Sequence, residues 1–271
     1  MKTLRSIAKI ALQSRCLVPA KIPADKAIVV LGNGPSLNTT IEQSLDVLRS
    51  LPCMAVNFAA LADVLREIRP QYYVLADPHF FIEDGGEGSN LSRLRDAFKR
   101  IDWPMTLFVP ARCVKAARRF YASANVSLRP FNAVGVEGWR PLVHAAFRLG
   151  LGMPRPRNVL IPAIMLAIGE GFGTVYVAGA DHSWTATLSV TDENEVVSVQ
   201  PHFYADSGHE EARVRHEYQG YRLHQIMESF TIAFRSYHEI AAWAQRRGVD
   251  IVNVTPGSFI DAFRRGRLPQ K

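Results

Sequence analysis

The segment at positions 27–37 reads AIVVLGNGPSL, and it decides the fold. Its first five residues are apolar and rich in β-branched side chains, which is typical of a strand buried on both faces of a parallel sheet. A turn follows, GNGPS at positions 32–36, in which Pro35 suits the first turn of a helix and Ser36 suits its cap. Free N–H groups at a strand-to-helix turn bind phosphate, so we expect a nucleotide site here. A glycine-rich turn without a ligand is the alternative.

Two common kinds of nucleotide site do not fit this turn. The Walker motif is absent, which argues against a P-loop ATPase or GTPase. The dinucleotide fingerprint is incomplete, because Leu37 stands where its third glycine is expected. An NAD site also needs an acidic residue after the second strand, whereas the second predicted strand, Cys53–Val56, is followed by the amide Asn57.

Polar side chains follow three successive predicted strands. Asn33 follows the first strand, Asn57 the second, and Asp77 the third, at positions 72–76. Because parallel strands end at the same edge of a sheet, we expect these three side chains at one site. The amide of Asn57 both donates and accepts hydrogen bonds, so it suits a sugar hydroxyl or the edge of a base.

Composition and charge narrow the class of protein. A chain of 271 residues suits one large α/β domain, or one domain with a lid. Its net charge of +7 favours anionic partners such as a nucleotide-sugar, an acidic glycan or a membrane face. No helix-turn-helix, zinc-finger or RNP motif occurs, so we expect no nucleic-acid partner. Three widely spaced cysteines, Cys16, Cys53 and Cys113, indicate a reduced cytoplasmic protein without a zinc site.

Two later motifs extend the pattern of strand ends. Positions 164–181 read IMLAIGEGFGTVYVAGAD, which predicts a helix, a Gly-aromatic turn and a strand that ends in Gly-x-Asp. Positions 252–258 read VNVTPGS, which predicts a strand followed by a Pro-x-Ser turn. With GNGPSL, Asn57 and Asp77-Pro78, they resemble the bacterial sialyltransferases of glycosyltransferase family forty-two. They also resemble the related motility-accessory-factor nonulosonate transferases and archaeal-type hydroxymethylpterin diphosphokinases. The resemblance covers scattered motifs between residues 27 and 263.

The resemblance implies a fold and a reaction. The fold is α/β: a Rossmann-like, mostly parallel sheet with helices on both faces. The reaction is metal-independent and inverting transfer of sialic acid or a related nonulosonate from a CMP donor to a surface-glycan or glycolipid acceptor, without a cofactor. Polar and basic residues that face the nucleotide in the family map to Arg157 and Asn158, although a small hydroxyl residue is usual at the latter position. The full set expected to bind the nucleotide is Gly32, Asn33, Gly34, Pro35, Ser36, Asn57, Asp77, Arg157, Asn158, Gly179, Asp181 and Ser183.

The catalytic residues are also expectations from the resemblance. The family's base is a His on the loop after the Gly-x-Asp strand, which maps best to His202, with His182 second and His209 third. Family tyrosines after that strand stabilise the leaving phosphate; Ser183 and Trp184 stand there instead, so Tyr204 is the substitute we expect. We expect no metal, because there is no Asp-x-Asp motif and the histidines lack the i, i+4 spacing of two ligands on one helical face.

Between these motifs the chain alternates predicted strands and helices. Further strands are expected at 105–109, 173–179 and 249–254, and helices at 39–51, 59–68, 91–101, 111–122, 141–149, 159–169, 221–245 and 259–264. An insertion at about 185–220 interrupts the alternation; it begins with a predicted β-hairpin at 185–199, and we expect it to be a lid. We therefore divide the chain into an N-terminal basic helix at 1–22, one Rossmann-like domain at 23–263 and a basic tail at 264–271.

The N-terminal helix has two open interpretations. Its apolar residues share one face and its basic residues add positive charge; the apolar residues are Leu4, Ile7, Ala8, Ala11 and Leu12. Such a helix suits peripheral binding to the anionic inner membrane, or simple packing on the domain. No run of about 18 apolar residues occurs, so we expect no membrane span. With the cysteine pattern, this leaves the expected location as cytoplasmic, with or without peripheral contact to the inner membrane. An oligomer stays open.

Two rival functions stay open as well. The first is a hydroxymethylpterin diphosphokinase, which would need ATP, magnesium and a carboxylate pair such as Asp77 and Asp181. The second is a non-catalytic nucleotide-binding protein of envelope-polysaccharide assembly.

Overall fold

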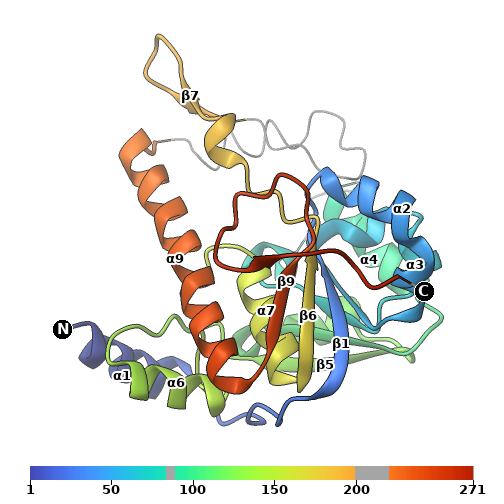
Figure 1. The fold of residues 1–271 in the computed structure, drawn as a ribbon, viewed down its shortest axis with the longest axis horizontal. Helices are drawn as coiled ribbons and strands as arrows, with labels where there is room; N and C mark the ends of the chain where they lie inside the picture. Colours follow the sequence, from blue (N-terminus) through green and yellow to red (C-terminus); the bar gives the residue numbers. More distant parts are fainter. Residues whose placement is uncertain (84–88, 199–219, 271) are drawn as a thin grey trace.

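The computed structural model of the chain describes residues 1–83, 89–198 and 220–270. Within them, eight strands form one parallel sheet in the order β10-β9-β6-β1-β2-β3-β4-β5, and β7 and β8 form a separate antiparallel hairpin (Figure 1). The predicted α/β class and the hairpin in the insertion are confirmed. The strands are β1 (Ala24–Leu31), β2 (Cys53–Val56), β3 (Tyr72–Val74), β4 (Met105–Pro110), β5 (Val126–Phe131), β6 (Phe172–Ala178), β7 (Ser189–Val190), β8 (Val196–Val197), β9 (Asp250–Asn253) and β10 (Arg264–Arg265).

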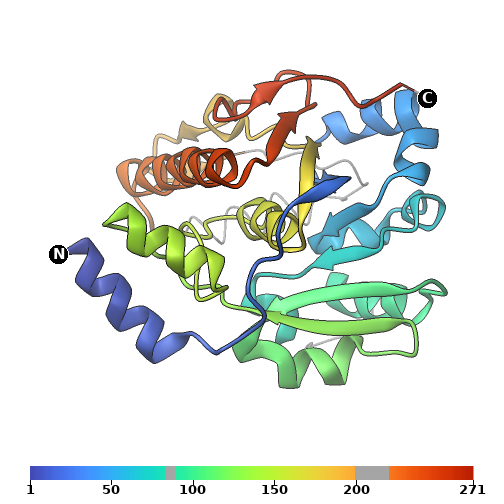
Figure 2. The same ribbon diagram turned by 60° about the horizontal axis from the view of Figure 1, so that its bottom comes forward.

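Helices cover both faces of the sheet, as Figure 2 shows from a second side. They are α1 (Lys2–Gln13), α2 (Ser36–Ser50), α3 (Leu65–Ile68), α4 (Asn90–Lys99), α5 (Val114–Tyr121), α6 (Arg140–Arg148), α7 (Leu160–Gly169) and α9 (Leu223–Arg247). Residues 28–31 of β1 are all buried, and they alternate between two cores because side chains along a strand point to opposite faces. Ile28 and Val30 pack with α6, α7 and α9, whereas Val29 and Leu31 pack with α2, α4 and α5.

The strand order reverses at β1. From β1 the chain passes to β2 on one side, continues to β5, and returns to β6 on the other side of β1. In the register, Val30 lies between Met54 of β2 and Val177 of β6. A crevice outside the carboxyl ends of the strands, at such a reversal, is where open α/β sheets bind ligands.

Two predicted helices are wrong. Residues 259–264 form no helix; they lead into β10, which pairs in parallel with β9. Side chains take up the backbone groups that a helix would use, since Ser258 Oγ accepts the Ile260 N–H and Asn253 Nδ2 donates to the Ile260 carbonyl. The helix predicted at 59–68 is a short 3₁₀ turn, Asn57–Leu61, followed by α3. There the Tyr73 hydroxyl accepts the Ala60 N–H, which ties the turn to β3.

The basic helix predicted at 1–22 is shorter than expected, because α1 ends at Gln13. In the predicted tail, Arg264 and Arg265 form β10 of the main sheet.

Most of the other predicted boundaries are close to those observed. The long helix predicted at 221–245 is α9, and it ends as expected at Gly248, which has φ +68°. Strand β5 was not among the predicted strands; it carries an exposed or half-buried middle section that lacks a continuous apolar run. Of the insertion expected to form a lid, residues 199–219 lie outside the described part of the chain.

Candidate active site

The turn after β1 packs directly against the turn after β6. The Gly32 N–H donates to the Ala178 carbonyl at 2.7 Å, and the Gly34 N–H donates to the Gly179 carbonyl at 2.9 Å. A Cβ on Gly32 would lie 2.3 Å from the Gly179 oxygen, so no larger residue fits. Gly179 itself has φ +64°, a conformation that favours glycine. The glycines of this turn are therefore explained by the close approach of two protein segments.

Asp181 lies at the start of α2. Its Oδ1 accepts the Ser36 N–H at 3.3 Å and its Oδ2 accepts the Ser36 hydroxyl at 2.7 Å. A carboxylate is stabilised at a helix N-terminus by the unpaired N–H groups and the helix dipole. The expected capping role of Ser36 is wrong: Pro35 is the N-cap residue of α2, and the Ser36 side chain bonds to Asp181. An internal carboxylate thus occupies the place where the sequence suggested a bound phosphate.

Gly34→Ala is expected to destabilise the protein by about 1–3 kcal/mol, because the new Cβ would disrupt the Asp181–Ser36 hydrogen bonds. That Cβ would lie 1.9 Å from Asp181 Oδ2. The free energy of unfolding, measured in urea, checks this. Gly169→Ala is the matched control, because a Cβ on Gly169, at the end of α7, meets nothing within 4 Å. Equal effects of the two substitutions would show that the contact between the two turns is not needed.

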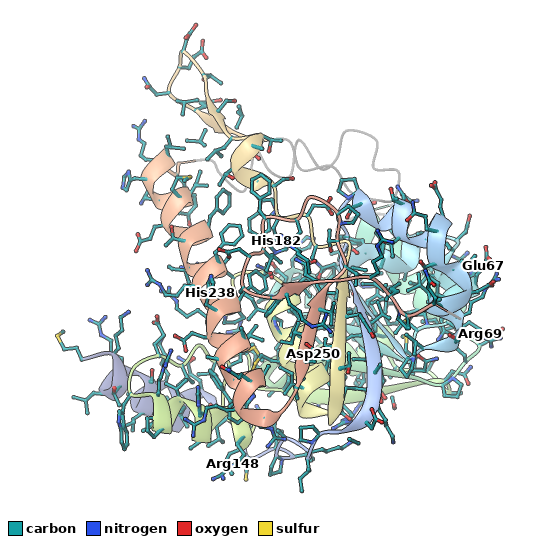
Figure 3. The ribbon with its side chains drawn as sticks, in the orientation of Figure 1. Glu67, Arg69, Arg148, His182, His238 and Asp250 are labelled. Atoms are coloured by element: carbon teal, nitrogen blue, oxygen red, sulfur yellow. The ribbon has the colours of Figure 1, made fainter. Side chains whose placement is uncertain are left out.

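A buried hydrogen-bonded chain joins the loop after β6 to two helices. His182 Nε2 lies 2.6 Å from the Tyr237 hydroxyl on α9, and that hydroxyl donates to Asn158 Oδ1 at 3.0 Å. Asn158 precedes α7, and its Oδ1 also accepts the N–H groups of Leu160 and Ile161. Figure 3 shows His182 between α9 and the end of the sheet. We call these three residues the His–Tyr–Asn chain; the sequence analysis missed its middle member, Tyr237.

The hydrogen bonds of this chain fix the tautomer of His182. Two backbone N–H donors identify the Asn158 acceptor as oxygen, so the single hydroxyl proton of Tyr237 points to Asn158. The Tyr237 oxygen then has to accept, and His182 Nε2 carries the proton. In a neutral imidazole this leaves the lone pair on Nδ1.

The surroundings of His182 keep it neutral. Burial lowers the pKa of His182 to about 3, and burial also raises the pKa of Tyr237. The rings of Trp184 and Phe234 pack against the imidazole with centroids 4.1 Å and 6.4 Å away. His182 also has φ +51°, which is uncommon for a residue other than glycine. A group with so low a pKa is a weak general base at neutral pH.

The loop after β9 forms hydrogen bonds with Ala180 and Asp181, which lie in the loop after β6. Thr255 Oγ1 accepts the Ala180 N–H at 3.0 Å, and the Ser258 hydroxyl donates to the Ala180 carbonyl at 2.6 Å. The Phe259 N–H donates to the Asp181 carbonyl at 2.9 Å. The VNVTPGS motif is thus adjacent to the Gly-x-Asp motif in space, and its hydroxyl residues support the loop that carries Asp181.

The polar residues predicted after β2 and β3 also lie at the carboxyl edge. Asn33 Nδ2 donates to the Val56 carbonyl at 3.3 Å, which connects the end of β1 to the residue before Asn57. Asn57 has φ +50°, and its Oδ1 is buried without a hydrogen-bond partner in the described part of the chain. Asp77 is exposed and accepts the His79 N–H at 2.8 Å, so it caps the short turn that follows β3.

The remaining predicted residues divide into two groups. Pro35 and Arg157 are exposed and Ser183 is half-buried. Each lies in a loop at the carboxyl edge of the sheet. His202, Tyr204 and His209 lie outside the described residues, so the predicted base and phosphate donor stay predictions. Among the residues that are described, no group of three or more His, Cys, Asp or Glu side chains is arranged to hold a metal ion.

Comparison with known proteins identifies a similar fold. No protein family model matches the chain, and no curated protein matches its sequence. The structure of the MAf glycosyltransferase from Magnetospirillum magneticum AMB-1 is similar, with a TM-score of 0.50 and 12% sequence identity. The match covers 98% of this chain and 38% of that one, so this chain spans well under half the length of its structural relative. The chain therefore has a glycosyltransferase-like α/β fold.

Proposed function

We propose that the protein is a metal-independent, inverting glycosyltransferase that uses a CMP-activated sialic acid or related nonulosonate and a glycan or glycolipid acceptor. Three findings support this proposal. The loops of the candidate site meet where the strand order reverses. The sequence motifs at those loops resemble nonulosonate transferases, and the fold is similar to that of a MAf glycosyltransferase.

The observation that carries the proposal is a pair of buried amide atoms without partners. Asn57 Oδ1 is an acceptor and Asn158 Nδ2 is a donor, and neither forms a hydrogen bond with the residues that the structure describes. Leaving such a group unsatisfied costs about 1–3 kcal/mol, so each is expected to have a partner in the working complex. A cytosine edge offers both an amino donor and ring acceptors, and ribose hydroxyls offer both functions as well.

The position of the Asp181 carboxylate argues against a phosphate at the turn after β1. Because Asp181 already occupies the start of α2, a phosphate at that turn would meet a negative charge. We therefore propose that residues 32–36 and Asn57 face the nucleoside. Arg157, Ser183 and Tyr204 are the donors that we propose for the phosphate, where hydrogen bonds stabilise the charge that develops on the leaving group.

The proposed reaction is a single displacement. The acceptor hydroxyl oxygen attacks the anomeric carbon of the donor sugar, the bond from that carbon to the phosphate oxygen breaks, and CMP leaves with the electron pair. The acceptor proton passes to a general base, for which we propose His202. His182 is unsuited to that role because of its low pKa; we assign it to holding the loop of Asp181 and Ser183 in place.

The sheet order argues against the diphosphokinase alternative. Asp77 follows β3 and Asp181 follows β6, with β1 and β2 between these strands. Three strand spacings put the two strand ends about 14 Å apart, too far for both carboxylates to bind one magnesium ion. Each carboxylate also accepts a hydrogen bond within the protein, from His79 and Ser36 respectively.

Thermal-shift measurements test the nucleotide. CMP without metal, at 100 times its Kd, is expected to add about 2.7 kcal/mol of stability and to raise the Tm by about 5–10 °C. Asn57→Gly is expected to abolish most of this shift, because it removes the amide but keeps a residue that adopts positive φ. Asn38→Ala, at an exposed position of α2, is the matched control.

The other arms of the same experiment distinguish the alternatives. Stabilisation by ATP with magnesium, and not by CMP, would refute the proposal in favour of the diphosphokinase. Stabilisation by CMP combined with no transfer from CMP-sialic acid to any sialyl-acceptor glycan would refute the transferase and favour a nucleotide-binding protein without catalysis.

A further inference from the structure

Helix α1 attaches to the protein by its polar side. Ser6 is only 3% exposed; its hydroxyl donates to the Glu137 carbonyl at 2.7 Å and accepts the Glu137 N–H at 2.8 Å. The Thr3 hydroxyl accepts the Trp139 N–H at 2.9 Å. On the same side, Ile10 reaches the edge of the core. An amphipathic helix of a globular protein normally buries its apolar side instead, so this orientation is unusual.

The apolar side of α1 is left exposed. At 100° per residue, one continuous arc of the helix holds Ile7, Ala11, Leu4, Ala8 and Leu12, opposite or adjacent to the attached side. The side chains of Leu4 and Leu12 are 72% and 84% exposed, and that of Ile7 is 45% exposed. All five residues are exposed, so the described part of the protein does not cover this arc.

Basic residues border the exposed arc. Arg5, Lys9 and Lys2 follow Leu12 around the helix, and all three are exposed. The helix has no acidic residue. A cationic border next to an apolar arc is the pattern of helices that lie in the interface of an anionic membrane.

The attachment of α1 is tight enough to present this arc in a fixed orientation. A Cβ on Gly138, which has φ +119°, would lie 2.4 Å from Thr3 Oγ1. Beyond the helix, the Arg15 N–H donates to Asn132 Oδ1 and the Arg15 carbonyl accepts from Asn132 Nδ2. Helix α1 lies beside α6 in both views, toward the end of the sheet opposite the candidate site (Figures 1 and 2).

We propose that α1 docks the protein on the surface of an anionic lipid bilayer, with Leu4, Ile7 and Leu12 in the interface and Arg5 and Lys9 at the lipid headgroups. The helix is 12 residues long, or about 18 Å, too short to cross a bilayer. No described helix is both long and apolar enough to span one. The basic border favours an anionic lipid surface over a second copy of the protein. Acidic headgroups complement its charge, whereas a second α1 would bring like charges together.

Vesicle flotation of the full chain tests this proposal. The protein is expected to float with vesicles of phosphatidylcholine and phosphatidylglycerol, and not with pure phosphatidylcholine. Binding is expected to weaken as salt rises, since the charges are exposed. The double variant Leu4→Gln/Leu12→Gln is expected to bind on the order of tenfold more weakly. The double variant Arg5→Gln/Lys9→Gln is also expected to bind on the order of tenfold more weakly, because it removes two cations that attract the acidic headgroups.

Matched controls keep the experiment specific. Val190→Gln/Met227→Gln removes two apolar side chains that are 47% and 41% exposed on other elements. Lys115→Gln/Arg118→Gln removes two exposed charges from α5. Both controls are expected to bind vesicles like the natural sequence.

Three results would overturn the proposal. One is absence of binding to anionic vesicles, and another is equal binding by the α1 variants and the controls. The third is a dimer in sedimentation that disappears in Leu4→Gln/Leu12→Gln while no vesicle binding is seen, which would make the arc an interface between copies. The thermal shift with CMP is expected to be unchanged in the α1 variants, so its outcome is separate from that of the proposed function.

Discussion

His202→Ala is expected to lower the rate of sugar transfer by about 100- to 10,000-fold, the range that a general base contributes. The residue is proposed as the base because an imidazole ordinarily has a pKa near 6.5, and because the family's base occupies the loop after the Gly-x-Asp strand. Transfer from CMP-sialic acid to a sialyl-acceptor glycan measures the effect. The rate of the natural sequence is expected to rise with pH as the imidazole loses its proton.

Two controls separate loss of the base from loss of binding. The thermal shift with CMP is expected to persist in His202→Ala, since the proposed nucleoside contacts lie elsewhere. His224→Ala removes an exposed imidazole at the start of α9 and is expected to keep full activity. Full activity in His202→Ala would refute the assignment, and equal loss in His209→Ala and none in His202→Ala would transfer the role to His209.

The fold was predictable because its signals are local. The apolar run that ends at Leu31 is buried in a central strand, and the polar residues Asn57 and Asp77 follow neighbouring strands. Each of these features depends on a few consecutive residues and on the geometry of parallel sheets. The helix predicted at 259–264 failed for the opposite reason: side chains of Asn253 and Ser258 bond to its backbone, and hydropathy gives no sign of that.

The interior of the site was not predictable in the same way. Ser36 and Asp181 are 145 residues apart, and Asn158 and Tyr237 are 79 apart. Tyr237 does fall on the buried face of α9, so helical spacing marks it as a core residue. Nothing in that spacing indicates that its hydroxyl joins His182 to the start of α7. Such pairings depend on how the elements pack, which a single sequence does not specify.

The stability of the protein is expected to fall as the pH drops below about 6.5, and His182 is expected to be a main cause. Its pKa is lowered to about 3 in the folded protein, whereas an unfolded chain has an ordinary imidazole pKa near 6.5. The unfolded state therefore binds more protons in this window, so acid favours unfolding. Each pH unit below 6.5 is expected to cost up to about 1.4 kcal/mol, with the full stability present above pH 6.5.

His182→Gln tests this account. Glutamine does not titrate, and its amide can still donate to Tyr237. The free energy of unfolding, measured in urea at pH 4.5, 5.5, 6.5 and 7.5, is expected to depend less on pH in this variant than in the natural sequence. The difference in slope is the relevant quantity, because burial also lowers the pKa of His144, which adds a dependence of the same sign to both proteins.

The control for this experiment removes an imidazole that the fold does not bury. His224→Gln, at an exposed position, is expected to keep the slope of the natural sequence. If His182→Gln also kept that slope, His182 would have to take up its proton in the folded state. A charged imidazole could still donate from Nε2 to Tyr237, but it would lie among Trp184 and Phe234 without a counter-charge among the described residues. The hydrogen bonds from His182 through Tyr237 to Asn158 would persist, but the assignment of His182 as a neutral positioning residue would fail.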